Sequence, residues 1–197
     1  MVQEAPKDTK LIVLSSRLVE RLRALALRRG VSISGFASEA LEQALRAGDM
    51  GVSIQEAVDL YQLMQIQKGA GALQVSRESL DQLIGKLYES SGEELRGIWY
   101  DAGRWYGEYL RVKLKGDDVL GFLEKALLLS WNLDEVEVKE DVGRVRLRCA
   151  SFMMSLEKTE LLVSYVSGVM FSLGYAEVGG EHLRGMALLR YGKVGNR

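Results

Sequence analysis

The side chains that could carry redox, metal or covalent chemistry are almost absent from this chain. Its 197 residues include one cysteine, Cys149, and one histidine, His182. One cysteine cannot form an intramolecular disulfide, and one histidine cannot supply a histidine-based metal cluster. His182 falls in an expected turn, where a histidine is usually solvated, and Cys149 falls in a strand pattern, where cysteine is usually a small core residue. We therefore expect no catalytic residues, no metal site, no cofactor and no enzymatic activity.

Basic side chains gather in the first quarter of the chain, although the formal net charge is −1. Residues 1–48 hold eight Lys and Arg against five Asp and Glu, a local charge of +3, so the remainder carries −4. This asymmetry favours a nucleic-acid partner for the N-terminal part. The cations of residues 10–29, which face only Glu20, are Lys10, Arg17, Arg21, Arg23, Arg28 and Arg29. Arg28 and Arg29 could equally complement the dipole at the end of a helix.

The elements that would position these cations are a strand and two helices. Residues 10–15 are rich in Leu, Ile and Val, which predicts a short strand. A leucine stripe predicts a helix over 16–29 that ends at Gly30, since glycine tolerates a left-handed conformation. Ser32 can cap a second helix that ends near Gly48.

This segment, KLIVLSSRLVERLRALALRRGVSISGFASEALEQAL, resembles the ribbon-helix-helix DNA-binding family. The resemblance implies that two chains pair their strands into a ribbon that enters the major groove of double-stranded DNA, while helix N-termini contact phosphate. It also implies a homodimer, and the physics agrees, because one strand with two short helices cannot bury both faces. The implied DNA-binding residues are Thr9, Lys10, Leu11, Val13, Arg17, Arg21, Ser32 and Ser34.

The strand departs from the pattern needed to read bases. Its groove-facing positions would be Thr9, Leu11 and Val13, whereas base edges are read by donors and acceptors such as Arg, Asn or Gln. Three alternatives stay open. The register could shift by one residue and turn Lys10 outward, binding could rest on phosphate contacts and DNA shape, or the ribbon could serve dimerisation alone.

Residues 49–92 predict a helical connector. Ser53 and Glu56 form a capping-box pattern before a helix that ends near Gly69, and Ser76 starts a second helix. Ser91 and Glu94 form another capping box and start a third helix. Between the first two helices, the Gly69-Ala-Gly71 step is the best candidate for a hinge.

Residues 93–197 predict an α+β domain of helices packed on antiparallel strands. A helix from Glu93 carries Gly103 and Gly107 four residues apart, which close packing would explain, and another helix follows Asp117. Alternation over 136–149 predicts a hairpin with Val136, Val138, Val145, Leu147 and Cys149 inward. A helix over 160–173 buries Leu162, Val166, Val169 and Met170, and strands at 176–178 and 186–191 form a second pair across GGEHLRG.

The stretches YDAGRWYGEYL, LGFLEKALLLSWNLDEVEV and VSYVSGVMFSLGY resemble the vinyl-reductase-type small-molecule-binding domain. The positions that carry the resemblance are Gly103, Gly107, Trp131, Gly168 and Gly174. It implies an apolar cavity for a small hydrophobic ligand. The side chains that could line the cavity are Trp99, Trp105, Tyr106, Tyr165 and Met170, which could instead be ordinary core.

Together these patterns predict a homodimeric DNA-binding transcriptional regulator with a C-terminal domain that senses a small hydrophobic ligand. The expected domains are the ribbon-helix-helix module at 1–48, the connector at 49–92 and the ligand-binding domain at 93–197. The alternative is a dimeric protein-interaction scaffold whose ribbon serves only dimerisation. No apolar run approaches the ~20 residues that cross a bilayer, and the N-terminus lacks a secretory pattern, so we expect no membrane partner and a cytoplasmic protein.

Overall fold

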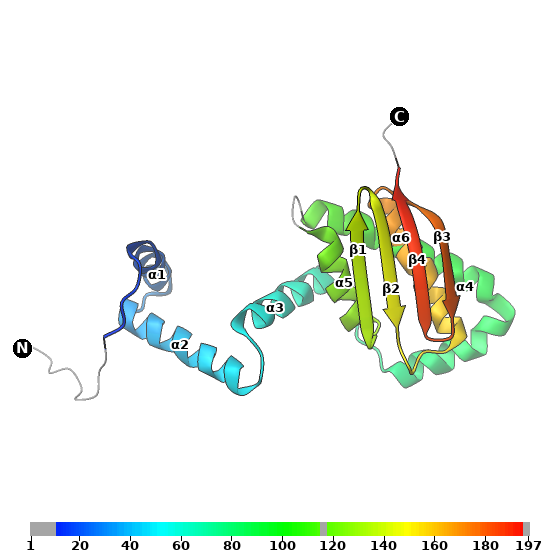
Figure 1. The fold of residues 1–197 in the computed structure, drawn as a ribbon. Coiled ribbons are helices and arrows are strands. Elements are labelled where there is room, and N and C mark those ends of the chain that lie inside the picture. The colour runs from blue at the N-terminus through cyan, green and yellow to red at the C-terminus, as the bar shows by residue number, and fades with distance from the viewer. Residues whose placement is uncertain (1–10, 115–117, 195–197) are drawn as a thin grey trace, which may run out of the picture. The chain divides into compact units, whose positions relative to one another are not determined.

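The computed structural model describes residues 11–114 and 118–194. Six helices and one antiparallel sheet of four strands make the described chain α+β, as the sequence predicts (Figure 1). Contacts divide the chain into two compact units, residues 1–60 and 61–197, and each unit is described by itself. Residues 61–92, which we expected in a connector, belong to the second unit.

The first unit is helical. Helix α1 spans Ser16–Arg29 and ends at Gly30, whose φ of 68° is the left-handed conformation expected of this glycine. Helix α2 spans Ile33–Asp49, and the Oγ of its cap, Ser32, accepts a hydrogen bond of 3.0 Å from the Gly35 amide. Both helices therefore begin where the sequence predicts, because caps and glycine stops are local signals.

The strand expected over residues 10–15 is not formed within one chain. Residues 11–15 have no strand pairing, and Lys10 lies outside the described residues. The backbone of residues 11–14 also makes no hydrogen bond to the part of the chain that the structure describes. A ribbon needs the strand of a second chain, so the ribbon stays a prediction.

Helix α3 spans Ile54–Gly69 and begins with the predicted capping box. The Ser53 amide donates to the Glu56 carboxylate over 2.6 Å, and the Glu56 amide donates to the Ser53 Oγ over 3.1 Å. These bonds hold the pKa of Glu56 below its ordinary value, chiefly because the ionised carboxylate accepts the Ser53 amide.

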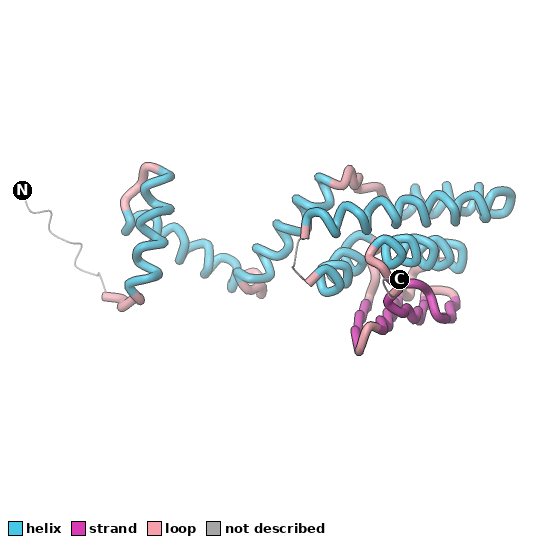
Figure 2. Tube along the Cα trace, turned by 90° about the horizontal axis from the view of Figure 1, so that it is seen from above, coloured by secondary structure: helices cyan, strands magenta, loops and turns pink. Residues whose placement is uncertain are grey.

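The second unit is a sheet with its helices on one face (Figure 2). The helices are α4 (Arg77–Lys113), α5 (Val119–Ser130) and α6 (Leu156–Ser172). Helix α6 contacts both the sheet and α4, so it lies between them. The strands, β1 (Glu135–Asp141), β2 (Arg144–Ala150), β3 (Tyr175–Leu183) and β4 (Met186–Lys193), run in the order β1-β2-β4-β3.

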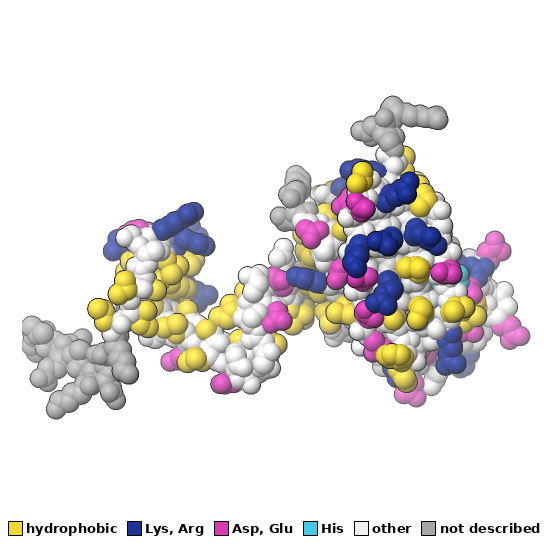
Figure 3. All heavy atoms as spheres, viewed as in Figure 1, with side chains coloured by type: hydrophobic (Ala, Val, Ile, Leu, Met, Phe, Trp, Pro, Cys, Tyr) yellow, Lys and Arg dark blue, Asp and Glu magenta, His cyan; other side chains and the backbone are white. Residues whose placement is uncertain are grey.

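The two faces of the sheet differ as strand alternation requires. Val145, Leu147 and Cys149 are buried under the helices, as predicted, and Val136 and Val138 are half-buried against the same core. The outward face carries the charged residues, and Figure 3 shows Lys and Arg side chains gathered over β2 and β4. One face therefore forms the core and the other meets solvent.

The first hairpin closes through two residues with positive φ. Val142 has φ 42° and Gly143 has φ 73°, the combination of a two-residue turn whose twist matches the strands. Glycine adopts this conformation freely, but a β-branched residue does so only under strain. Val142 is almost fully exposed, so neither packing nor burial explains its presence.

The second hairpin is longer than the sequence predicts. We expected GGEHLRG to connect the strands, but Gly179, Gly180 and His182 lie within β3, and the turn is at Arg184-Gly185. The register shifts between Glu177 and Gly179, where a bulge uses the φ of 149° at Gly179. His182 is therefore an exposed strand residue opposite Ala187, not a turn residue.

The two helices expected on either side of Ser91 meet at a kink within α4. Ser91 has non-helical angles (φ −139°, ψ 25°), so one helical segment ends there and a second begins, as the sequence predicts. Further along α4, a Cβ at Gly103 would lie 2.0 Å from the Tyr165 carbonyl oxygen of α6. A Cβ at Gly168 would lie 2.1 Å from the Tyr100 carbonyl oxygen. These glycines let the two helix backbones touch, as predicted for Gly103.

Helix α6 supplies the centre of the core. Its Leu162, Val166, Val169 and Met170 are buried, as expected, although the helix begins four residues before the predicted start at Glu160. Within the described residues, no helix is long and apolar enough to cross a membrane.

Candidate functional site

The second unit has a half-enclosed pocket of about 250 Å³ where α4, α5 and α6 meet. Helix α4 contributes Arg77, Leu80 and Trp99, and the loop before it contributes Val75. The end of α5 and the turn after it contribute Ser130, Trp131 and Asn132, and the first turn of α6 contributes Lys158.

The apolar part of the pocket rests on aromatic rings. Trp99 and Trp131 line it, and the Trp131 ring lies 5.5 Å from the Tyr165 ring, which lies 6.1 Å from the Tyr106 ring. Burial raises the pKa of both Tyr106 and Tyr165 well above the ordinary value, so both phenols stay neutral. The wall behind Trp131 is therefore a packed cluster of uncharged rings that are tilted against one another.

The polar part of the pocket lining has two cations, Arg77 and Lys158, which share a carboxylate partner, Asp81, outside the lining. Lys158 has only 9% of its side chain exposed, and its Nζ lies 2.9 Å from the Asp81 Oδ1. The Arg77 Nε lies 4.0 Å from the Asp81 Oδ2. Since an ammonium group has three donors and a guanidinium has five, Asp81 leaves most of their donor capacity unused.

The pocket wall is hydrogen-bonded to α3, the helix through which the chain enters this unit. The Gln67 Nε2 donates to the Ser130 Oγ over 2.7 Å and to the Tyr106 hydroxyl over 3.3 Å. Gln67 of α3 is therefore hydrogen-bonded both to a pocket residue, Ser130, and to one ring of the aromatic cluster, Tyr106. A shift of either partner would break or lengthen these bonds.

The five side chains expected to line a cavity divide into four groups. Trp99 lines the pocket, whereas Tyr165 and Tyr106 support it from behind through Trp131. Met170 is fully buried in the general core. Trp105 is 53% exposed and stacks on Tyr109 outside the pocket lining.

Sequence reasoning missed the charged lining. Lys158 precedes Leu162 and Val166 by four and eight residues, so it continues the buried stripe of α6. A lysine in such a stripe signals a buried cation with a partner. The signal was hidden because we expected the helix to begin at Glu160.

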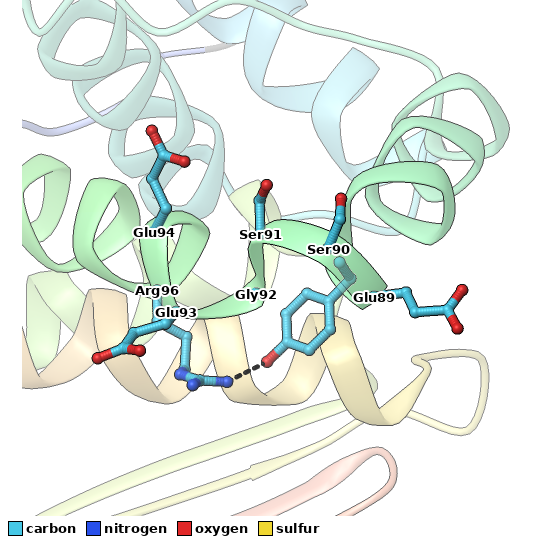
Figure 4. Close-up of a pocket in the computed structure, with 8 residues that line it drawn as sticks. Glu89, Ser90, Ser91, Gly92, Glu93, Glu94 and Arg96 are labelled. Carbon is cyan, nitrogen blue, oxygen red and sulfur yellow. Dashed lines mark hydrogen bonds between the residues drawn. The ribbon is translucent and has the colours of Figure 1, made fainter.

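A larger but more open hollow of about 690 Å³ lies at the kink of α4 (Figure 4). There Arg96 Nη1 donates to the Tyr88 hydroxyl over 2.8 Å and to Glu160 over 2.9 Å, and the Tyr88 hydroxyl donates to Glu160. In Figure 4 the side chains of Ser91 and Glu94 point upward side by side and that of Glu89 points to the right, so the three do not converge on one point. Because its polar groups diverge, this hollow is a weaker candidate than the pocket with convergent groups.

The residues expected to bind DNA lie on an exposed surface of the first unit where the structure describes them; Thr9 and Lys10 lie outside the described residues. Leu11 and Val13 are 93% and 88% exposed. Arg17 and Arg21 line a shallow hollow on α1, while Ser32 and Ser34 lie exposed at the start of α2.

The cations of α1 divide into paired and unpaired groups. Arg23 pairs with Glu20 over 2.9 Å, and Arg29 lies 3.6 Å from Glu39 with its guanidinium over the Phe36 ring. For Arg17, Arg21 and Arg28, no carboxylate of the described residues lies within 4.0 Å. Arg28 and Arg29 both lie in the last turn of α1, where a cation complements the negative end of the helix dipole.

Apolar side chains of the first unit lack burial within one chain, and Figure 3 shows many of them at its surface. Of its described residues, Ala26 alone is buried. The large apolar side chains of residues 11–45 that are exposed are Leu11, Ile12, Val13, Leu14, Leu18, Leu25, Leu27, Val31, Ile33, Leu41 and Leu45.

Comparison with known proteins does not assign a family. No family model and no curated protein matches the chain. Among solved structures, one chain described as "Probing the function of heme distortion in the H-NOX family" is 17% identical, with a TM-score of 0.38, over 73% of this chain and 91% of that one. Another, described as "Modulating Heme Redox Potential Through Protein-Induced Porphyrin Distortion", is 13% identical, with a TM-score of 0.37, over 64% and 85%. At such TM-scores these likenesses carry no argument about this chain.

Proposed function

We propose that the chain is a homodimeric DNA-binding transcriptional regulator whose second unit binds a small ligand. The observation that carries the proposal is the first unit, which combines unpaired cations with an apolar surface that one chain leaves exposed.

The exposed apolar surface supports the dimer. Residues 11–49 comprise two helices and a preceding segment without helix or strand, and Ala26 is their one buried residue in the described structure. Folded modules of about 40 residues usually need disulfides, a metal or oligomerisation. A disulfide between the two halves of this module is excluded because the single cysteine, Cys149, lies in the other unit. A second copy would bury the leucines of α1 and α2 and pair the free backbone of residues 11–14.

The cations support DNA as the partner. Arg17 and Arg21 are four residues apart on α1, on one face of the helix, and neither has a carboxylate partner among the described residues. Side chains of this kind bind phosphates and release counterions. The exposed Leu11 and Val13 offer methyl groups and no base-reading donors, so we expect affinity to rest mainly on the DNA backbone.

The ligand pocket supports regulation. Gln67 ties the Ser130 hydroxyl of the pocket wall to α3, the helix through which the two units are joined in sequence. A ligand that binds better to one position of Ser130 and Trp131 would favour one state of this bond over the other. Regulation requires that difference in affinity, because equal affinity for both states shifts nothing.

DNA affinity measured against salt concentration tests the proposal. The full-length protein is titrated onto a labelled 30-base-pair duplex, with its mass followed by light scattering. Four contacts, from Arg17 and Arg21 of two chains, predict a slope of log K on log salt of about −3.6, at −0.9 per contact. The double variant Arg17→Ala/Arg21→Ala should flatten the slope and keep the dimer, whereas Lys86→Ala, which removes an exposed cation of α4, should leave the slope unchanged.

A monomer, or a dimer that binds no DNA at low salt, would refute the regulator. The second result would favour the scaffold, in which the ribbon serves dimerisation alone. The fully exposed Leu11 and Val13 are the observation behind that alternative.

A further inference from the structure

The pocket between α4, α5 and α6 combines an aromatic wall with an excess of positive charge. Trp99 and Trp131 provide flat apolar surface, and Lys158 and Arg77 share the single carboxylate of Asp81. A ligand that fills the pocket meets both features at once. This inference deepens the proposed function, on which it rests for the biological role of binding, although binding itself can be measured without DNA.

The charge balance points to an anionic group on the ligand. Two cations against one carboxylate leave one positive charge in a partly enclosed site. Lys158 is nearly buried, so water screens its charge poorly. Arg77 and Lys158 also lie in the first turns of α4 and α6, where the helix dipole adds positive potential. An anion in the pocket would accept the donors that Asp81 leaves unused.

The pocket volume and its aromatic rings indicate the size and the type of the uncharged part of the ligand. A volume of about 250 Å³ holds a single ring with a short substituent better than a long chain. Trp99 and Trp131 can pack on an aromatic ring, and Leu80 adds an aliphatic contact.

We propose that this pocket binds a small aromatic carboxylate, with the ring between Trp99 and Trp131 and the carboxylate at Lys158 and Arg77. Asp81 then acts as an internal competitor, because it occupies the same cations in the empty pocket. The ligand carboxylate must bind beside it and share the two cations.

Calorimetric titration of the full-length protein at pH 7 with benzoate and with benzamide tests the charge requirement. The two probes have nearly the same shape, but only benzoate is ionised. We expect benzoate to bind at least about tenfold more tightly, which corresponds to ~1.4 kcal/mol. Equal or tighter binding of benzamide, or no binding of either probe, overturns the proposal.

Variants that remove a cation and variants that remove the carboxylate should change the affinity for benzoate in opposite directions. Lys158→Met should abolish the preference for benzoate, and Arg77→Gln should reduce it several-fold. Arg77 is half-exposed, so that variant should fold normally even if removal of the buried lysine does not. Asp81→Asn should strengthen benzoate binding several-fold and leave benzamide unchanged. A purely structural role of Asp81 predicts weaker binding of both probes and would contradict the proposal.

The tryptophans supply the matched control. Trp131→Leu should weaken both probes, whereas Trp105→Leu, which alters an exposed ring outside the pocket lining, should weaken neither. The ligand class and the regulator fail separately. Benzoate binding without any DNA binding would refute the regulator alone, and binding only of a neutral aromatic with a DNA response would refute the anionic ligand alone.

Discussion

The close contact between α4 and α6 predicts that Gly103 cannot be replaced by a larger residue without loss of stability. A methyl group added at Gly103 would lie 2.0 Å from the Tyr165 carbonyl oxygen, whereas real Cβ contacts stay above 3.0 Å. The obstacle is helix backbone, which cannot rotate away as a flexible side chain can. The substitution Gly103→Ala therefore forces the two helices apart by about 1 Å, enough to lose a quarter to a half of each dispersion contact along the interface.

The expected change in the free energy of unfolding of Gly103→Ala combines two opposite effects. Overpacking in a well-packed core costs ~1–3 kcal/mol, and the better helix propensity of alanine returns ~1 kcal/mol. Gly97→Ala in the same helix provides the control, because a Cβ there meets nothing within 4 Å. That variant should gain ~0.5–1 kcal/mol. The same substitution, six residues apart, should therefore change the free energy of unfolding with opposite signs and a difference of about 2 kcal/mol.

Urea unfolding followed by tryptophan fluorescence measures this difference, because Trp99, Trp105 and Trp131 all lie in the second unit. The signal is then free of any contribution from the first unit. If Gly103→Ala were as stable as Gly97→Ala, the close approach of α4 and α6 would be wrong.

Three further predictions concern a strained turn residue, a buried thiol and one hydrogen bond. Val142→Asn should stabilise the second unit by about 1 kcal/mol in the same urea assay, since asparagine tolerates the φ of 42° that strains valine; an unchanged midpoint would contradict the strained turn. Burial raises the pKa of the Cys149 thiol from 9.0 to about 12, so its stabilising effect is complete below pH 9 and is lost as the pH rises towards 12. The folded protein should accordingly resist a thiol reagent at pH 8 and react on unfolding; rapid reaction of the native state would refute the burial. Gln67→Leu should leave benzoate binding intact but reduce any effect of benzoate on DNA affinity, and an unchanged effect would exclude the Gln67–Ser130 bond from the coupling.

Local signals account for the elements that the sequence predicted well. The start of α2 at Ser32, the end of α1 at Gly30 and the capping box of Ser53 and Glu56 each depend on residues within one helical turn. The Gly179-Gly180 pair shows the limit of such signals. Two glycines favour a turn, but pairing with β4 carries the strand through them and turns the first into a bulge. That outcome depends on pairing with Leu189 and Arg190 of β4, about ten residues further along the chain, and not on the dipeptide itself.

The candidate pocket was only partly predictable for a geometric reason. Trp99 and Trp105 are six residues apart, about 240° around a helix, so they cannot share a face, whereas Tyr106 is seven residues from Trp99 and can. Helical arithmetic separates the pocket residue from the exposed one. It could not reveal Lys158, which reaches the pocket from another helix through the packing of α6 on α4.

The packing of α6 on α4 links the glycines to the candidate pocket. Trp99 and Arg77 come from α4 and Lys158 comes from α6, so the distance between the aromatic wall and the buried cation depends on how closely the two helices approach. Gly103 and Gly168 fix this approach at backbone contact. A larger residue at either position would widen the pocket as well as destabilise the unit. In the proposed ligand pocket, Gly103 and Gly168 would therefore affect binding through the spacing of α4 and α6 and without contact with the ligand.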